Sequence, residues 1–319
     1  MTSEKGTRSH AGPLPQPFFW RLHPDGLCEG VSLAEYLARE LSIPPHEASD
    51  LIDFGSVQVD GRQARSGAMF LKGVSEVRVY PPYNGTRRHY EIDVRRILHR
   101  DTCLLAYDKE AGIPSQQTPS DAYNNVFAAL KRYLAAERIG EPYVALHHRL
   151  DRETSGILLV SLMKKANRTL GGAFAQRKIR KDYLAWVLGH PRKDYWTASE
   201  DIGRKGGRYC TLPKGTGKSA ETAFWVLWRE SGRTLVHGCP VTGRTHQIRL
   251  HLAAHGTPVL GDTMYGGGRE DRLYLHAWRL TIVHPSTGKT LHLTAPVPPD
   301  WKVPVHVILP PPWDFHDSR

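Results

Sequence analysis

The sequence predicts an α+β protein that combines a small N-terminal module with a larger domain. A chain of 319 residues suggests two domains. Near the N-terminus, two short helical patterns precede two alternating strand patterns, and further along strand patterns are interspersed with amphipathic helical patterns. We therefore divide the chain into a flexible arm, a module, a linker, a main domain and a tail, at residues 1–20, 21–83, 84–90, 91–310 and 311–319.

The composition is that of a globular protein with an excess of basic residues. Hydrophobic residues make up 40% and charged residues 24% of the chain, which are ordinary values. The net charge of +11 favours a polyanionic partner, and nucleic acid before a membrane surface because no lipidation motif or basic amphipathic anchor is present. The apolar runs are too short to cross a bilayer and no signal core is seen, so we expect a cytoplasmic protein.

The sequence predicts no metal and no cofactor. Its four cysteines are scattered without a C-x-x-C pair, which is typical of reduced thiols. Gly217-Lys218-Ser219 resembles part of a nucleotide phosphate loop, but Leu212 occupies the position of the leading glycine. His251 and His255 have the spacing of a zinc-binding helix but lack its glutamate.

Each element of the N-terminal module has a local signal. Ser32 and Glu35 have the spacing of a capping box, which predicts a helix to about Leu41. A second helix and two strands are expected at about residues 46–53, 57–59 and 77–80. This order, over residues 31–82, resembles the S-four-type (α-L) RNA-binding domain. A generic helix-and-hairpin module with no binding role is the alternative.

The main domain is expected to contain both strands and helices. Strand patterns occur at residues 104–107, 157–160, 223–228 and 235–239. Helical patterns occur at residues 120–137, 167–177 and 245–255. Ser120 and Thr245 have the residue type of N-caps. The glycine-rich basic segment 204–218 is expected to be a mobile loop.

Residues 147–156 are the stretch around which the main domain is organised. Basic residues surround Asp151 there, and the apolar run that follows has the length and β-branched content of a buried strand. Asp151 is therefore expected on a loop at the mouth of a core strand, where a rigid scaffold can aim a reactive group. On spacing alone, the alternative is that Asp151 pairs with Arg149 or Arg152 to hold a turn.

Five segments, in order, resemble the motifs of the RluA family of RNA pseudouridine synthases. They lie at residues 108–114, 148–156, 181–185, 243–266 and 275–296. Glu110 departs from the pattern, because the family has proline there. The resemblance spans roughly residues 90–300, and it implies a mixed, mainly antiparallel sheet flanked by helices, with a basic cleft.

The resemblance implies that three residues isomerise uridine to pseudouridine. Asp151 would be the catalytic carboxylate, with attack on the sugar, attack on the base and deprotonation all open to it. Arg249 would form a salt bridge that keeps Asp151 ionised, since a nearby cation lowers a carboxyl pKa. Tyr183 would cover one face of the uracil ring. The alternatives are a surface arginine and a core tyrosine. No cofactor is needed, because the product keeps every atom of the substrate.

The same motifs imply a set of substrate contacts. Arg149 would take the place of the extruded base through its planar guanidinium. His148 is expected to hold the loop by hydrogen bonds, and Ile248 to form an apolar wall opposite Tyr183. The other expected substrate contacts are Thr154, Gly156, Arg244, His246 and Gln247.

The expected substrate is a structured RNA. The RluC and RluD branches of the family carry an N-terminal RNA-binding module, so large-subunit ribosomal RNA is the first choice and transfer RNA the second. A non-catalytic RNA-binding or assembly factor with the same fold is the alternative from a different class. A monomer is the default expectation.

Overall fold

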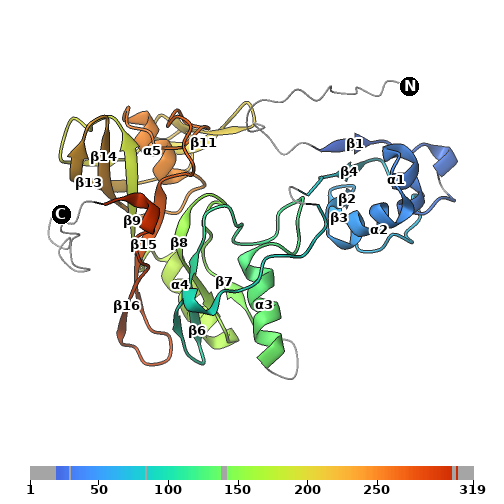
Figure 1. Cartoon of the computed structure of the whole chain (residues 1–319), viewed down its shortest axis with the longest axis horizontal. Helices are drawn as coiled ribbons and strands as arrows, with labels where there is room; N and C mark the ends of the chain where they lie inside the picture. The colour runs from blue at the N-terminus through green and yellow to red at the C-terminus, as the bar shows by residue number, and fades with distance from the viewer. Residues whose placement is uncertain (1–18, 29, 83–84, 138–141, 304–306, 308–319) are drawn as a thin grey trace. The chain divides into compact units, whose positions relative to one another are not determined.

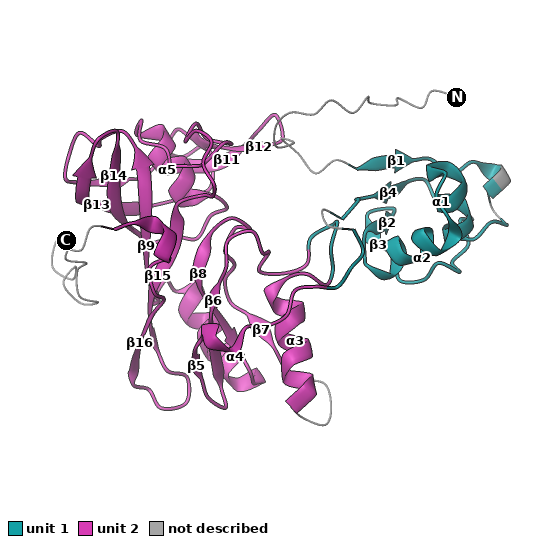
Figure 2. Cartoon of the chain, in the orientation of Figure 1, with its two compact units in different colours: residues 1–88, 118–122 teal, residues 89–117, 123–319 magenta. Residues whose placement is uncertain are grey.

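The computed structural model describes residues 19–28, 30–82, 85–137, 142–303 and 307. Most of the predicted arm and all of the predicted tail lie outside these residues. Two compact units are present (Figure 2), one of residues 1–88 and 118–122 and one of residues 89–117 and 123–319. Among the described residues, no helix has the length and apolar content needed to cross a membrane.

The first unit is a four-stranded antiparallel sheet with two helices. The strands run in the order β1-β4-β2-β3, with β1 (Trp20–Leu22), β2 (Val57–Val59), β3 (Arg62–Gln63) and β4 (Val77–Val79). The two α-helices are α1 (Leu33–Leu41) and α2 (Pro45–Asp53), and the short 3-10 helix η1 (Gly26–Cys28) precedes them. The predicted capping box is present, since Ser32 Oγ accepts from the Glu35 N–H and Glu35 accepts from the Ser32 N–H. Leu33 and Leu37 of α1 pack with Ile52 of α2 in one core.

The second unit is built on a mixed, mainly antiparallel sheet of ten strands (Figure 1), which confirms the predicted fold class. The main order is β10-β13-β14-β9-β15-β8-β6-β5, while β16 pairs with β15 and β7 with β8. The β15–β8 pair is parallel and the other pairs of this sheet are antiparallel. The bounds are β5 (Ile97–Arg100), β6 (Leu104–Lys109), β7 (Ala145–Leu146), β8 (Ser155–Ser161), β9 (Arg180–Leu188), β10 (Tyr195–Ala198), β13 (Thr222–Glu230), β14 (Arg233–Pro240), β15 (Leu275–Val283) and β16 (Thr290–Thr294).

Helices cover both faces of the sheet at β6 and β8. On one face, α3 (Val126–Glu137) packs against Leu158 and Val160 of β8. On the other face, α4 (Lys164–Ala175) packs against Ile157 and Leu159. Because alternate residues of a strand point to opposite faces, a strand covered on both sides is apolar throughout. This explains the unbroken apolar run after Gly156.

A third helix, α5 (Gln247–Ala254), covers the sheet at β9 and β14. Ile248 and Leu252 of α5 pack against Val187 and Val236. The predicted stop is present, because Gly256 has a φ of +79° and follows the helix directly. Two further short helices are η2 (Val94–Arg96) and η3 (Pro299–Trp301).

Three expectations about elements are wrong. The helix predicted from Ser120 begins at Val126, because the Asn125 side chain accepts from the Ala128 N–H and so starts the helix later. The helix predicted from Thr245 has His246 as its N-cap, in a left-handed conformation with φ +57° and no side-chain cap.

The third wrong expectation is the mobile loop at residues 204–218. Part of it forms an antiparallel hairpin of β11 (Asp201–Lys205) and β12 (Arg208–Leu212). Gly206 and Gly207 both have positive φ and make the turn between the strands. The glycines that suggested mobility therefore mark a tight turn.

Candidate active site

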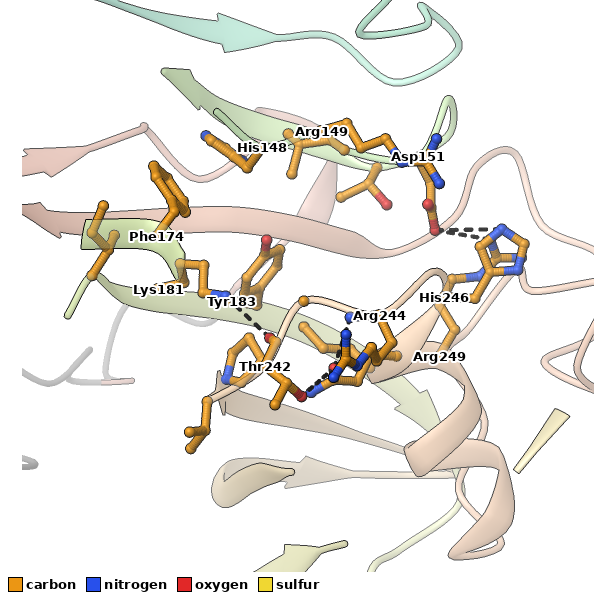
Figure 3. Close-up of a pocket in the computed structure, with 18 of the residues that line it drawn as sticks. His148, Arg149, Asp151, Phe174, Lys181, Tyr183, Thr242, Arg244, His246 and Arg249 are labelled. Carbon is orange, nitrogen blue, oxygen red and sulfur yellow. Dashed lines mark hydrogen bonds and ion pairs between the residues drawn. The ribbon is translucent and has the colours of Figure 1, made fainter. Parts of the chain in front are cut away.

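A cavity of about 540 Å³ opens on the second unit beside the Asp151 loop. Its walls come from the 147–154 loop, the end of α4, β9 and residues 240–249. Figure 3 shows Asp151 facing His246 and Arg249 at one end, with Phe174 and Lys181 toward the other. The volume is that of a small-ligand site, so it has room for one small organic group.

The loop that carries Asp151 is held by hydrogen bonds from buried groups. Ser115 Oγ accepts from the Leu150 N–H at 2.9 Å and the Thr154 N–H donates to the Asp151 carbonyl at 3.1 Å. Lys109, fully buried, donates to three carbonyls, among them that of Arg152 at 2.9 Å. Several fixed backbone groups flank Asp151, so its side chain projects from a rigid loop.

Asp151 is paired with a cation that is itself fixed. Arg249 Nη1 lies 3.1 Å from Asp151 Oδ2. The same guanidinium donates through Nε and Nη2 to the two oxygens of Asp262, at 2.7 and 2.9 Å. Burial alone would lower the pKa of Arg249, but the hydrogen bonds and charges of Asp262 and Asp151 raise it above its ordinary value. Arg249 is therefore a permanent cation. Asp262 binds its Nε and Nη2, and its Nη1 donates to Asp151.

His246 is the second basic side chain at the Asp151 carboxylate. Its Nε2 lies 3.8 Å from Asp151 Oδ2, and its Nδ1 lies 2.7 Å from the Tyr265 hydroxyl. Burial lowers the pKa of His246, while the charge of Asp151 opposes that shift. The imidazole is therefore mainly uncharged at neutral pH.

Tyr183 lies on β9 and lines the cavity, as Ile248 of α5 does. Burial, and then the charge of Asp151, raises the pKa of Tyr183 above its ordinary value. The phenol therefore keeps its proton at neutral pH, and its ring and hydroxyl both face the space beside Asp151. Asp151, Tyr183 and Arg249, which come from three distant segments, meet at one cavity.

His148 and Arg149 have different surroundings. His148 Nε2 accepts from the Leu159 N–H at 3.0 Å, and its ring stacks on Phe174 at 5.4 Å. Burial lowers the pKa of His148 to about 3, so this nitrogen stays an acceptor and ties the loop to β8. Arg149 is exposed and donates to Thr245 Oγ1 at 3.1 Å. Of these two residues, Arg149 is therefore the one whose side chain can contact a ligand that approaches from solvent.

The remaining predicted contacts divide into two groups. Thr154, Arg244 and Gln247 line the cavity, whereas Gly156 is absent from its walls. Gln247 is buried, accepts from Thr242 Oγ1 and the Arg244 N–H, and donates to the Glu221 carbonyl. Gln247 therefore holds the loop before α5.

Gly156 is required by backbone packing. Its φ is +108°, and an added Cβ would lie 2.2 Å from the Ala277 carbonyl oxygen, where β8 and β15 run in parallel. Only a residue without a side chain lets the two strands approach this closely.

Three residues of the site were not among the predicted site residues. Asp262 and Tyr265 hold Arg249 and His246, and Lys181 donates to the Thr242 carbonyl at 3.1 Å on the cavity wall. Asp262 and Tyr265 belong to the Gly-Asp and Tyr-Gly pairs of the fourth motif. A buried arginine needs a carboxylate partner, but spacing in the sequence does not single out Asp262 among the acidic residues.

One cluster away from the cavity has the composition of a metal site. Within the described ranges, His99, Asp101 and His284 place three potential ligand atoms within 4.8 Å of one another. Asp101 Oδ2 lies 2.8 and 2.9 Å from the two Nε2 atoms. His284 Nδ1 accepts from the N–H groups of Ser286 and Thr287, so its hydrogen resides on Nε2. That nitrogen therefore donates to Asp101 and has no lone pair for a metal.

Comparisons with known proteins found a matching family model and similar chains. A family model described as RNA pseudouridylate synthase matches residues 103–254. The chain is 34% identical to ribosomal large subunit pseudouridine synthase C of Pasteurella multocida, over 86% of this chain and 89% of that one. It is 35% identical to the synthase C of Escherichia coli, over 84% and 90%. The structure of human RNA pseudouridylate synthase domain containing 4 is similar, with a TM-score of 0.54 and 25% identity over 65% of this chain and 90% of that one.

Proposed function

Because the chain belongs to the RluA family of RNA pseudouridine synthases, we propose that it isomerises specific uridines of large-subunit ribosomal RNA. The chain is an RNA pseudouridine synthase, and RNA is its partner. Support for the ribosomal substrate comes from the names of the relatives, which are large-subunit enzymes. Transfer RNA is the second candidate substrate.

One observation carries the catalytic assignment. The carboxylate of Asp151 lies 3.1 Å from a buried guanidinium, in a cavity that Tyr183 also lines. The reaction breaks the bond between uracil N1 and ribose C1′ and forms a bond from C5 to C1′. Arg249 holds the Asp151 carboxylate in place through the ion pair, and the carboxylate acts on the nucleoside as nucleophile or base. The protein adds no atom to the product, so the side chains present suffice.

Tyr183 and Ile248 hold the detached base while it turns. Both side chains line the cavity, Tyr183 from β9 and Ile248 from α5. An aromatic ring and an apolar wall stabilise a base by stacking and contact, and these interactions tolerate rotation in the plane of the base. Tyr183 and Asp151 line the same cavity. The neutral Tyr183 hydroxyl assists removal of the C5 proton as a relay, giving its own proton to the Asp151 carboxylate as it takes the one from C5.

A uridine in a helical RNA reaches this cavity only when it is extruded. Extrusion costs a few kcal/mol, and Arg149 offsets part of that cost by stacking in the vacated position. Arg149 suits this role because it is exposed and its guanidinium is planar. Arg244 lines the same cavity and contacts the RNA backbone.

The test of the catalytic assignment is tritium release from C5 of uracil in bulk RNA. Asp151→Ala is expected to abolish release while RNA affinity is kept, because the carboxylate acts in the chemical step. Asp194→Ala is the matched control, since the Asp194 side chain is 80% exposed and pairs with Arg229 on the surface. Equal release by Asp151→Ala and wild type would overturn the assignment, and release by neither would favour a non-catalytic RNA-binding factor.

The substrate is tested by mapping pseudouridine in total RNA from cells with and without the gene. Sites lost from large-subunit ribosomal RNA are expected. Loss confined to transfer RNA would replace the first substrate by the second.

A further inference from the structure

We propose that Tyr265 and His246 form a second positioning arm for the Asp151 carboxylate, acting beside the arm formed by Asp262 and Arg249. The inference rests on the proposed function and deepens it. It reassigns His246 from an expected substrate contact to a residue that acts through Asp151, and it extends the role of Tyr265 from holding His246 to positioning the Asp151 carboxylate.

The backbone holds the His246 ring in a set place. His246 is the N-cap of α5 and has a φ of +57°, a left-handed conformation that is uncommon for residues other than glycine. Its ring meets Tyr265 edge-on at 5.6 Å and Tyr209 edge-on at 5.7 Å. Unfavourable backbone conformations persist where the surroundings fix a functional side chain. Here the rings of Tyr265 and Tyr209 contact the His246 ring and hold it in this position.

The Tyr265 hydroxyl and the Asp151 carboxylate together select the imidazole tautomer. The hydroxyl lies 2.7 Å from Nδ1, and burial raises the pKa of Tyr265 to about 12, so the hydroxyl carries a proton to donate. When Nδ1 accepts that proton in a hydrogen bond, the hydrogen of the neutral ring resides on Nε2. Nε2 faces Asp151 Oδ2 at 3.8 Å. The opposite tautomer would point a lone pair at a carboxylate, which is repulsive.

Both arms start from one turn. Asp262 and Tyr265 are joined by a hydrogen bond from the Tyr265 N–H to the Asp262 carbonyl at 3.2 Å, and the Gly267 N–H donates to the same carbonyl at 2.8 Å. The guanidinium of Arg249 lies 5.1 Å over the Tyr265 ring. The turn therefore fixes both residues that face the Asp151 carboxylate, Arg249 and His246. The 3.8 Å gap is longer than a hydrogen bond, and catalytic contacts of this kind tighten when substrate binds.

Charged and titratable groups face His246 from every neighbouring element. They are Asp151 and Arg149 on the 147–154 loop, Arg249 on α5, Asp262 and Tyr265 on the turn, and Tyr209 on β12. Asp151 and Asp262 favour the protonated ring, whereas Arg249 and Arg149 disfavour it.

The test compares single-turnover rates of four variants of the full chain. Tyr265→Phe and His246→Leu are each expected to be slower than wild type by about 10-fold to 100-fold, because a carboxylate out of place slows the chemical step. RNA affinity is expected to stay unchanged. The double variant is expected to be no slower than His246→Leu, since Tyr265 acts only through His246. His246→Gln, whose amide nitrogen reaches the place of Nε2, is expected to recover much of the rate.

The pH profile separates positioning from a merely structural role. Without the Tyr265 hydroxyl, the neutral ring loses the hydrogen bond at Nδ1 that supports its Nε2–H tautomer, whereas a protonated ring carries hydrogens on both nitrogens. The pKa of His246 is below the ordinary value of 6.5. The deficit of Tyr265→Phe is therefore expected to shrink as the pH falls from about 8 to about 5.5.

Three results would overturn the proposal. They are a Tyr265→Phe variant as fast as wild type, deficits that multiply in the double variant, and a Tyr265→Phe deficit that does not change with pH. If His246→Leu does not fold, Tyr265→Phe and His246→Gln still decide. An active wild type with unaffected variants overturns this inference alone, whereas an inactive wild type overturns the proposed function with it.

Discussion

The carboxylates of Asp151 and Asp262 share one guanidinium, that of Arg249. Asp262 takes two nitrogens of Arg249 and has no exposed side-chain surface, whereas Asp151 takes one nitrogen and is 25% exposed. The buried carboxylate therefore anchors the guanidinium, and the more exposed carboxylate of Asp151 faces the cavity. A single arginine–aspartate pair would leave the cation free to turn, so the second carboxylate gives the pair its direction.

We expect Asp262→Asn to slow the single-turnover rate by about 100-fold, because Arg249 loses its bidentate partner and shifts relative to Asp151. The free energy of unfolding should fall by about 3 to 5 kcal/mol, since a buried cation loses one of its two carboxylates. RNA affinity should change little. Asp300→Asn is the control, because Asp300 pairs with Arg272 at a half-exposed site. A rate within about twofold of wild type would show that Asp151 alone orients Arg249.

At the scale of elements, β8 links the core to the catalytic loop. It begins at Ser155, four residues after Asp151, and is buried along its whole length. Its one parallel neighbour is β15, which pairs at Gly156 with Ala277. Because the backbones are in contact there, the position of the Asp151 loop is set by a strand more than a hundred residues away in sequence.

Gly156→Ala should lower the free energy of unfolding by about 4 kcal/mol or more, because its Cβ meets backbone and its φ is unfavourable for alanine. Urea unfolding measures the change. Gly171→Ala is the matched control, since Gly171 lies inside α4 with open space around it. That variant should be more stable by about 1 kcal/mol. A Gly156→Ala protein as stable as wild type would mean that β8 and β15 separate without cost.

At the scale of the whole molecule, the sequence predicts those features that depend on residues close together in the chain. The α1 capping box and the buried strand β8 follow from residues within one element, and the fold class follows from motif order. The start of α3 and the β11–β12 hairpin were predicted wrongly, since an asparagine cap and a two-glycine turn look like loop signals in sequence. The pairing of Arg249 with Asp262 and of His246 with Tyr265 depends on how a turn folds back onto α5, which no spacing rule predicts.

The net charge of +11 favours RNA binding, and the β11–β12 hairpin is a candidate surface for it. The β11–β12 hairpin and the segment after it carry exposed cations, among them Lys205, Arg208 and Lys214, and Tyr209 of the hairpin contacts His246 at the cavity. If these cations bind RNA phosphates, each releases a counterion. Replacing all three by glutamine should then reduce the slope of log affinity against log salt by roughly 2, at about 0.7 per contact for a single strand.

The control variant removes the same charge from exposed positions elsewhere on the second unit, at Arg192, Lys193 and Lys289. Its salt slope should match wild type, because a change in net charge alone leaves the number of phosphate contacts unaltered. Binding is measured by titrating the RNA substrate at several salt concentrations. Equal slopes for the two triple variants would mean that the basic surplus attracts RNA as a diffuse field, and that the hairpin contacts no phosphate in the bound state.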